Sequence, residues 1–245
     1  MIATRIALVV AVLLTLASSG ARADAPAAGS VRGTVTLKGT PPKPPDAKFP
    51  ADLGPKDTAF CRAKTPLVPP FYVVDSANHL KDTVVWLEGV APSGAGATTQ
   101  RSLVNADCRF EPHVQTMTVG DELKVVNRDP VLHNTHPVYL GDKSTLFNIA
   151  LPEQGQEVKK KVKKAGVLKV QCDAGHVWMR AFVHVFEHRF HAVSGADGAF
   201  VISDVPPGRY TLKAWHEAAG TQSHEVEVAA GSVVRELSFD VKPAP

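Results

Sequence analysis

The chain consists of short stretches in which apolar and polar residues alternate, and each stretch ends at glycine, proline, asparagine or aspartate. No segment keeps apolar residues at the spacing of a long helix. Alternation with a period of two places apolar side chains on one face of a strand. Valine, threonine, isoleucine, phenylalanine and tyrosine, which favour strands, are prominent in these stretches. The clearest examples are SVRGTVTLKG, DTVVWLEGV, VQTMTVGDELKVVNRD, GVLKVQC, AFVHVFEH, GAFVISDV and GRYTLKAWHE. The sequence therefore predicts an all-β fold of sandwich or barrel type.

Two turn-rich segments interrupt the strand pattern. Residues 41–58 are rich in proline and polar residues, which is typical of a loop or linker. Residues 91–100, APSGAGATTQ, form a second break. After the N-terminal leader, these features divide the chain into residues 24–99, 100–188 and 189–245.

The first of these sections contains two predicted strands, near residues 31–38 and 83–89. Helix is expected only as short turns, for which residues 53–63 and 217–222 are the candidates. The middle section holds most of the histidines and two of the three cysteines. The search for a functional site therefore starts there.

The N-terminus has the pattern of a Sec-type signal peptide over residues 1–23. A basic start precedes an apolar run, and the small-x-small pattern Ala21-Arg22-Ala23 predicts cleavage before Asp24. The apolar run is short for a membrane span of about 20 residues, so we favour cleavage over an uncleaved anchor. No cysteine follows the run to carry a lipid. We therefore expect an exported protein, periplasmic or secreted, with no transmembrane segment after cleavage.

The charge of the chain is nearly balanced, with 27 basic and 24 acidic residues. Removal of the leader takes away Arg5 and Arg22, which leaves 25 basic residues against the same 24 acidic ones. Overall charge therefore argues against a nucleic-acid binder. The one charge run, KKKVKK at residues 159–164, fits docking of an acidic redox partner or an edge strand protected by lysine. We favour the edge strand.

The three cysteines are Cys61, Cys108 and Cys172. In an oxidising compartment an odd count leaves one thiol unpaired or held by something else. Only Cys172 has neighbours of metal-ligand type, because His176 and Met179 follow it closely. We therefore favour a Cys61–Cys108 disulfide over the other two pairings.

A Cys-His-Met loop follows one of the predicted strands. In QCDAGHVWM, three residues separate Cys172 from His176 and two separate His176 from Met179. A histidine far upstream, His133, lies in another loop. Copper favours imidazole nitrogen together with thiolate, and a weak axial thioether completes such a site. A β-sandwich can bring the two loops together, because it clusters several loops at one end.

The middle section resembles the cupredoxins, the blue-copper family of plastocyanin and azurin. The resemblance covers about 90 residues, a typical domain size. It includes VGDELKVVNRD, the His133-Asn134 pair, AGVLKVQC and the Cys-His-Met loop. It implies a Greek-key β-sandwich that binds one copper ion. His133, Cys172 and His176 would be the equatorial ligands and Met179 the axial one, while Asn134 would tie the two ligand loops together.

The spacing of the loop departs from the family pattern. Plastocyanin-like loops place two residues between cysteine and histidine and four before methionine, and amicyanin-like loops share only the short second gap. The dinuclear centre of cytochrome oxidase subunit two has matching spacing but needs a further cysteine where this chain has Leu168. We therefore expect one ion and leave its fourth ligand open between Met179 and two reserve candidates, His113 and His136.

Other interpretations of these residues compete with copper. Zinc also takes cysteine and histidine ligands. Cys172 alone could be a buried structural thiol, and Met179 alone could fill the core. A thiol-redox role is weaker, because no C-x-x-C motif is present. Trp178 fits a partner-docking patch or a core position equally well. His184 alternates with apolar residues on a predicted strand and is not expected to be a ligand.

The C-terminal section carries a second resemblance. Residues 192–217 contain Asp-Gly and Pro-Pro-Gly turns between alternating strands, and match the ADG-x-F…VPPG-x-Y-x-L core of the carboxypeptidase regulatory-like family. That resemblance implies a small transthyretin-like β-sandwich. Its opening strand would be RGTVTLKG at 32–39. We therefore expect residues 31–99 and 189–241 to form one sandwich with the cupredoxin inserted between them.

The sequence thus predicts an exported, monomeric copper protein that transfers single electrons to or from an unidentified redox protein. A copper carrier or sensor without such a partner is the first alternative, and a redox enzyme with an open red-copper site is another. A structural β-protein with a decayed site is the last. No Ser-His-Asp set, phosphate loop or paired carboxylates stand out. We therefore favour an electron carrier over an enzyme.

Overall fold

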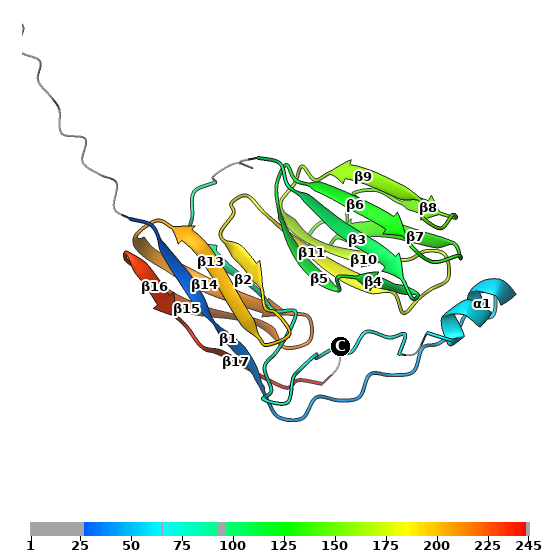
Figure 1. Ribbon diagram of the computed structural model, residues 1–245, viewed down its shortest axis with the longest axis horizontal. Coiled ribbons are helices and arrows are strands. Elements are labelled where there is room, and N and C mark those ends of the chain that lie inside the picture. Colours follow the sequence, from blue (N-terminus) through cyan, green and yellow to red (C-terminus); the bar gives the residue numbers. More distant parts are fainter. Residues whose placement is uncertain (1–26, 65, 93–96, 244–245) are drawn as a thin grey trace, which may run out of the picture.

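The computed structural model describes residues 27–64, 66–92 and 97–243, so the leader predicted at residues 1–23 lies outside the described residues. The described chain is all-β apart from the short helix α1 (Pro55–Arg62). It forms two β-sandwiches side by side (Figure 1). The strands are β1 Gly29–Lys38, β2 Val84–Glu88, β3 Gln100–Ala106, β4 Arg109–Glu111, β5 Val114–Thr118, β6 Glu122–Asn127, β7 His133–Tyr139, β8 Ile149–Leu151, β9 Glu157–Lys161, β10 Gly166–Gln171, β11 Arg180–Phe186, β12 His191–Val193, β13 Ala199–Val205, β14 Gly208–His216, β15 Gly220–Val228, β16 Gly231–Val234 and β17 Leu237–Asp240.

The first sandwich contains all strands from β3 to β11. One sheet has the order β5-β11-β10-β7-β8 and the other the order β4-β3-β6-β9. Alternate residues of these strands, such as Leu123 and Val125 on β6, point into a shared core. Strand β9, which carries the first lysines of the KKKVKK run, pairs only with β6 among the described strands and so lies at a sheet edge. Its lysines are exposed, as expected for a protected edge strand.

The second sandwich combines strands from both ends of the chain. In one sheet β1 pairs with β13, β16 and β17, and the other sheet has the order β12-β2-β14-β15. Figure 1 shows the blue strand β1 between the orange and red C-terminal strands. Val31 and Val35 of β1 share a core with Ile202 of β13 and Leu212 of β14. The first sandwich is therefore an insertion between β2 and β12 in the sequence.

The long connection between β1 and β2 leaves the second sandwich. It runs to the far end of the first sandwich, forms α1 there, and returns (Figure 1). Leu53, Leu67 and Val68 of this connection are buried in the core of the first sandwich. We refer to residues 47–68 as the cap segment. The described residues of the section 24–99 therefore contribute to both sandwiches, whereas the sequence predicts them to be part of the second one.

Helix appears at one of the two expected places. Helix α1 lies within residues 53–63, starts with Pro55 at its first turn, and has Asp57 and Arg62 at the ends that suit their charges. The expectation of helix at 217–222 is wrong. Residues 217–219 form the tight turn from β14 into β15, and residues 220–222 begin β15, where Gly220 has a φ of +87°.

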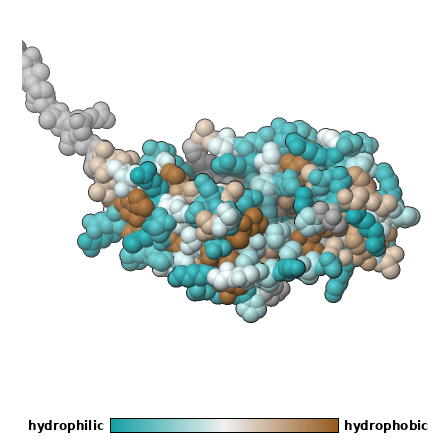
Figure 2. Space-filling view, turned by 60° about the horizontal axis from the view of Figure 1, so that its bottom comes forward, coloured by the Kyte–Doolittle hydropathy of each residue, from teal (hydrophilic) through white to brown (hydrophobic). Residues whose placement is uncertain are grey.

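A third apolar cluster joins the two sandwiches. Val84 of β2, Val114 of β5 and Phe182 of β11 are buried in it, and Trp86 and Trp215 pack against it. On the face shown in Figure 2, hydrophobic residues lie in small groups among hydrophilic ones. Within the described ranges, no helix is long and apolar enough to cross a membrane.

Candidate metal centre

Three sequence-predicted ligands meet at the α1 end of the first sandwich. His133 begins β7, Cys172 directly follows β10, and His176 lies in the loop before β11. The antiparallel ladder of β7 and β10 ends with Gln171 opposite His136, which brings Cys172 beside the start of β7. One ligand atom from each of the three residues lies within 4.8 Å of those of the other two.

The three side chains are closed off from solvent. His133 and His176 are 0% exposed and Cys172 is 6% exposed. The Cys172 Sγ lies 3.6 Å from the His176 Nδ1, and the two imidazole rings are 4.7 Å apart. The arrangement therefore provides a buried thiol and two buried imidazoles around one point.

Asn134 links the two loops that carry these ligands. Its backbone N–H donates to the Cys172 Sγ at 3.3 Å, and its Oδ1 accepts a hydrogen bond from the backbone N–H of Asp173 at 3.2 Å. Its side-chain nitrogen also donates to Asn148. These bonds correspond to the role that the cupredoxin resemblance implies for Asn134.

Asp129 orients His133, and the sequence analysis did not identify it. The His133 Nε2 lies 2.8 Å from the Asp129 Oδ2, so this nitrogen carries the proton and donates it. The His133 Nδ1 is buried and has no hydrogen-bond partner among the described residues. Its lone pair is therefore available to a metal, as in other sites where a carboxylate holds a ligating histidine. The sequence feature that could have pointed to this role is the position of an aspartate four residues before His133.

The same carboxylate also holds the turn between β3 and β4. Asp129 accepts hydrogen bonds from the backbone N–H groups of Asp107 and Cys108, both at 2.8 Å. Asp107 and Cys108 have φ values of +50° and +56°, a left-handed conformation that residues other than glycine adopt rarely. Cys108 forms a disulfide with Cys61 of α1. Asp129 thus ties the disulfide turn to the metal-ligand geometry.

Local electrostatics favour the thiolate form of Cys172. Burial raises the pKa of this thiol, but its interactions with His133, His176 and the Asn134 backbone N–H outweigh it and lower the pKa to about 6. Burial also lowers the pKa of His133, yet Asp129 and Cys172 together raise it above its ordinary value. Because the thiolate is the form that binds metals, the centre is prepared for a cation.

Trp178 and Met179 are both buried beside these ligands. Trp178 donates from its indole nitrogen to the Cys108 carbonyl at 2.9 Å and packs edge-on against His176, with ring centroids 5.4 Å apart. It is therefore a core aromatic and not an exposed docking residue. Met179 is 2% exposed, lies in the same core cluster as Cys172, and its backbone N–H donates to the His176 carbonyl.

The two reserve ligands do not join the centre. Both ring nitrogens of His113 are engaged, one with the Arg180 carbonyl at 3.1 Å and one with Glu217 at 2.6 Å. Both nitrogens of His136 are engaged as well, with Asp173 at 2.6 Å and with Thr145 at 2.9 Å. Met179 is the one of the three candidates for a fourth ligand that lies in the same core cluster as Cys172. Unlike the nitrogens of His113 and His136, its sulfur is not engaged in a hydrogen bond among the described residues.

A buried ion network connects the second sandwich to the ligand loop. Glu217, in the turn between β14 and β15, accepts hydrogen bonds from Arg180 at 3.1 Å and from His113. Arg180 directly follows Met179 and also donates to the Pro69 carbonyl at 3.0 Å. The Glu217 side chain is only 5% exposed. Only the fold shows this pairing, because residue 217 is far from residue 180 in the sequence.

The donor set fits copper. Two imidazoles and a thiolate, with a thioether close by, are the ligands that copper takes in mononuclear trigonal sites. The observations that carry this fit are the unpartnered Nδ1 of His133, the lowered pKa of Cys172 and the burial of all three side chains. Tetrahedral zinc accepts the same residue types.

Comparisons with known proteins give structural likeness only. No family model matches the chain, and no curated protein matches it. A mutant amicyanin in its Cu(I) form is 21% identical over 41% of this chain and 97% of its own, with a TM-score of 0.30. A purple cupredoxin from Nitrosopumilus maritimus is 23% identical over 34% of this chain and 97% of its own, also with a TM-score of 0.30. A Cu-containing nitrite reductase from Thermus scotoductus SA-01 is 19% identical over 40% of this chain and 26% of its own, with a TM-score of 0.31. At these values we base the function on the side chains of this chain alone.

Proposed function

We propose that the protein binds one copper ion through His133, Cys172 and His176, with Met179 as a weak axial ligand, and that it carries single electrons. The observation that supports this most is the closed cluster of one thiol and two imidazoles, whose ligand atoms all lie within 4.8 Å of one another. Bound copper would supply exchange between Cu(I) and Cu(II) in a site of this kind.

The residues of the chain would keep the geometry the same in both oxidation states. Asp129 fixes the ring of His133, and Asn134 fixes the position of Cys172. The cap segment and Trp178 exclude water from His176. Because these groups are held by hydrogen bonds and packing, little rearrangement should accompany electron transfer.

The copper-loaded protein tests this proposal directly. We expect one equivalent of Cu(II), added to the oxidised protein, to give an intense visible thiolate-to-copper absorption band and a mononuclear EPR signal. The variant Cys172→Ser should lose the band. The variant His184→Phe should keep it, because His184 is a buried histidine outside the candidate metal centre. A nearly colourless and weakly bound copper would overturn the proposal.

A copper carrier or sensor is the second candidate, because a closed site retains the ion until it is released. Exchange of the ion with a partner would need the cap segment to open. Two rates separate these functions. One is the rate of reduction of the copper protein in a stopped-flow experiment, and the other is the rate of copper loss to a chelator. Fast reduction with slow copper loss supports an electron carrier, and the reverse supports a copper carrier.

Two further measurements address the remaining alternatives. A competition between zinc and copper for the metal-free protein tests the zinc alternative. We expect copper to bind in preference, because thiolate with imidazole suits copper and because divalent copper binds such ligands more tightly than divalent zinc. Addition of azide to the Cu(II) protein tests for an open enzyme site. We expect no spectral change, because the ligands are buried.

The location and assembly of the protein also belong to this proposal. We propose export through residues 1–23, monomeric mature protein and a redox protein as the partner. Mass spectrometry of the protein from the extracytoplasmic fraction should give an N-terminus at Asp24. Recovery of the unprocessed chain from the cytoplasm would contradict export.

A further inference from the structure

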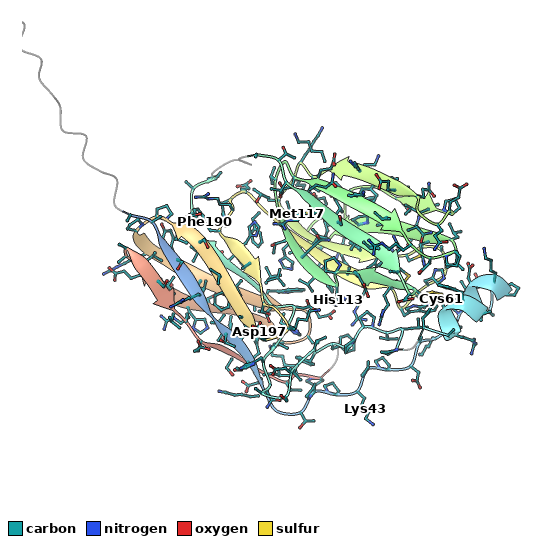
Figure 3. The ribbon with its side chains drawn as sticks, in the orientation of Figure 1. Lys43, Cys61, His113, Met117, Phe190 and Asp197 are labelled. Carbon is teal, nitrogen blue, oxygen red and sulfur yellow. A yellow bond between two sulfur atoms is a disulfide. The ribbon has the colours of Figure 1, made fainter. Side chains whose placement is uncertain are left out.

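The Cys61–Cys108 disulfide lies directly against the candidate copper centre. Its two sulfur atoms and a nitrogen of His176 lie within 4.8 Å of one another. All three residues are 0% exposed. Figure 3 shows Cys61 at the α1 end of the first sandwich. The disulfide therefore does more than join the cap segment to the sandwich, because it places two sulfurs next to a metal-ligand histidine.

The two ring nitrogens of His176 have different surroundings. The Nδ1 lies 3.6 Å from the Cys172 Sγ. The Nε2 is buried and makes no hydrogen bond to any residue in the described ranges. A buried polar nitrogen without a partner is uncommon and calls for a ligand at some stage of the protein's life.

We propose that Cys61, Cys108 and His176 form a second site, specific for Cu(I), when the disulfide is reduced. Thiolates are the soft ligands that select Cu(I), and a histidine nitrogen completes a three-coordinate set. The two thiols would each release a proton as they bind the ion. Such a reduced state exists whenever the exported chain has not yet been oxidised, since its cysteines leave the ribosome as thiols.

Formation of the disulfide would then pass the ion to the first site. This transfer rests on the proposed function, whereas Cu(I) binding at the second site does not. One S–S bond forms between Cys61 and Cys108. The two electrons go to the disulfide of an oxidising thiol–disulfide exchange protein, which becomes a dithiol and takes up two protons. The ion remains Cu(I) and moves to Cys172, His133 and the Nδ1 of His176.

The cap segment offers a path for the ion. A cavity of about 590 Å³ is lined by Phe49, Arg62, Leu67 and Val68, among others. Phe49 packs on Trp178 at 4.8 Å, and Trp178 packs on His176. Arg62 directly follows Cys61. Reduction of the disulfide removes the covalent tie of the cap segment at this point, so access and the new site arise together.

The variant Cys172→Ser tests the second site in isolation, because it lacks the thiolate of the first. The variant is reduced, freed of reductant without air, and titrated with Cu(I) against a coloured Cu(I) chelator. We expect it to hold one Cu(I), and to bind at least about 100-fold more weakly after the disulfide is re-formed, because two of three ligands are then gone. The control is the triple variant Cys61→Ser/Cys108→Ser/Cys172→Ser. Equal binding by the reduced single and triple variants would overturn the proposal.

X-ray absorption of the same Cu(I) complex tests the part played by His176. We expect two sulfur neighbours and one nitrogen neighbour, and about tenfold weaker binding after His176→Ala in the Cys172→Ser background. A sulfur-only shell would remove His176 from the site. If near-UV circular dichroism shows reduced Cys172→Ser unfolded, Cu(I) must restore the native spectrum there and fail to do so in the triple variant. The thiolate band of the oxidised, unmutated protein tests the first site separately, so failure of either site is recognised independently.

Discussion

Two groups of buried or half-buried histidines lie in this molecule, and their surroundings differ. His133 and His176 lie with Cys172, and Asp129 bonds to one of them. His184 and His191 lie where the two sandwiches meet, among aromatic rings. The ring of His184 is 4.4 Å from that of Trp215, and Phe186 stacks on His191 at 4.8 Å.

Each group contains buried ring nitrogens without a hydrogen-bond partner among the described residues, namely those of His133, His176, His184 and His191. Only in the first group do a nitrogen of each histidine and a cysteine sulfur lie within 4.8 Å of one another. Burial lowers the pKa of His184 to about 3 and that of His191 to about 4, whereas Asp129 and Cys172 raise the pKa of His133. The comparison shows that an anionic neighbour, and not the burial of ring nitrogens or the number of histidines, distinguishes the candidate metal centre from the aromatic group.

Removal of the thiolate should have the largest effect on this comparison. We expect Cys172→Ser to weaken copper binding by the oxidised protein about 1,000-fold, or roughly 4 kcal/mol, which exceeds the 10- to 100-fold that loss of an outer-shell partner costs. His184→Phe, the matched change in the aromatic group, should leave copper affinity unchanged. Competition with a chelator measures both. Equal losses in the two variants would place copper elsewhere.

The ion network beside the aromatic group should affect stability and not copper. Glu217→Gln leaves the partly buried Arg180 without its carboxylate, and should lower the free energy of unfolding by about 3 kcal/mol. The copper absorption spectrum should stay the same, since neither residue is a ligand. Chemical denaturation measures the first effect. A shifted spectrum with unchanged stability would instead make the network a positioning device for Met179.

Acid should destabilise the protein through the aromatic group. The folded pKa of His184 is about 3, below its ordinary value of 6.5, so the unfolded chain binds the proton first as pH falls. Stability from its neutral form is complete above about pH 6.5 and is lost progressively between about pH 6.5 and pH 3. At pH 5 this one residue should account for roughly 2 kcal/mol.

Denaturation of the metal-free protein at pH 7 and at pH 5 measures this loss. His184→Phe should reduce the difference between the two pH values, because phenylalanine does not titrate. The Lys64–Asp107 surface pair offers a control, and Lys64→Gln should leave the difference unchanged. A pH dependence unaffected by His184→Phe would assign the loss to other groups.

The all-β fold follows from alternation in the sequence, since strands such as β1 and β2 lie where the pattern predicts them. The turn motifs predict a sandwich that an insertion interrupts, and in the structure β1 pairs with the C-terminal strand β13. The cap segment could not be predicted in the same way. Leu53 and Leu67 lie in a proline-rich stretch without periodicity, and only the fold shows that they are buried.

The candidate site shows the same division between local and distant signals. Cys172 and His176 are close in sequence, and His133 stands out through its own loop motif. Asp129 and Glu217 act through hydrogen bonds that no spacing predicts, because an isolated carboxylate before a strand or in a turn is common on protein surfaces. His113 was a plausible ligand by residue type, and its distant partner Glu217 decides otherwise.

The smallest of these effects should come from the carboxylate that orients His133. Asp129→Asn keeps a side chain of the same shape but removes the negative charge that holds the proton on Nε2, so we expect copper affinity to fall about tenfold. Asp173→Asn is the matched control, because Asp173 bonds to His136, which lies outside the ligand cluster. Chelator competition on both variants gives the comparison. Equal affinities for the Asp129 variant and the unmutated protein would show that the sulfur and two imidazoles alone separate the metal centre from the aromatic histidines, and that the carboxylate serves only the turn at Cys108.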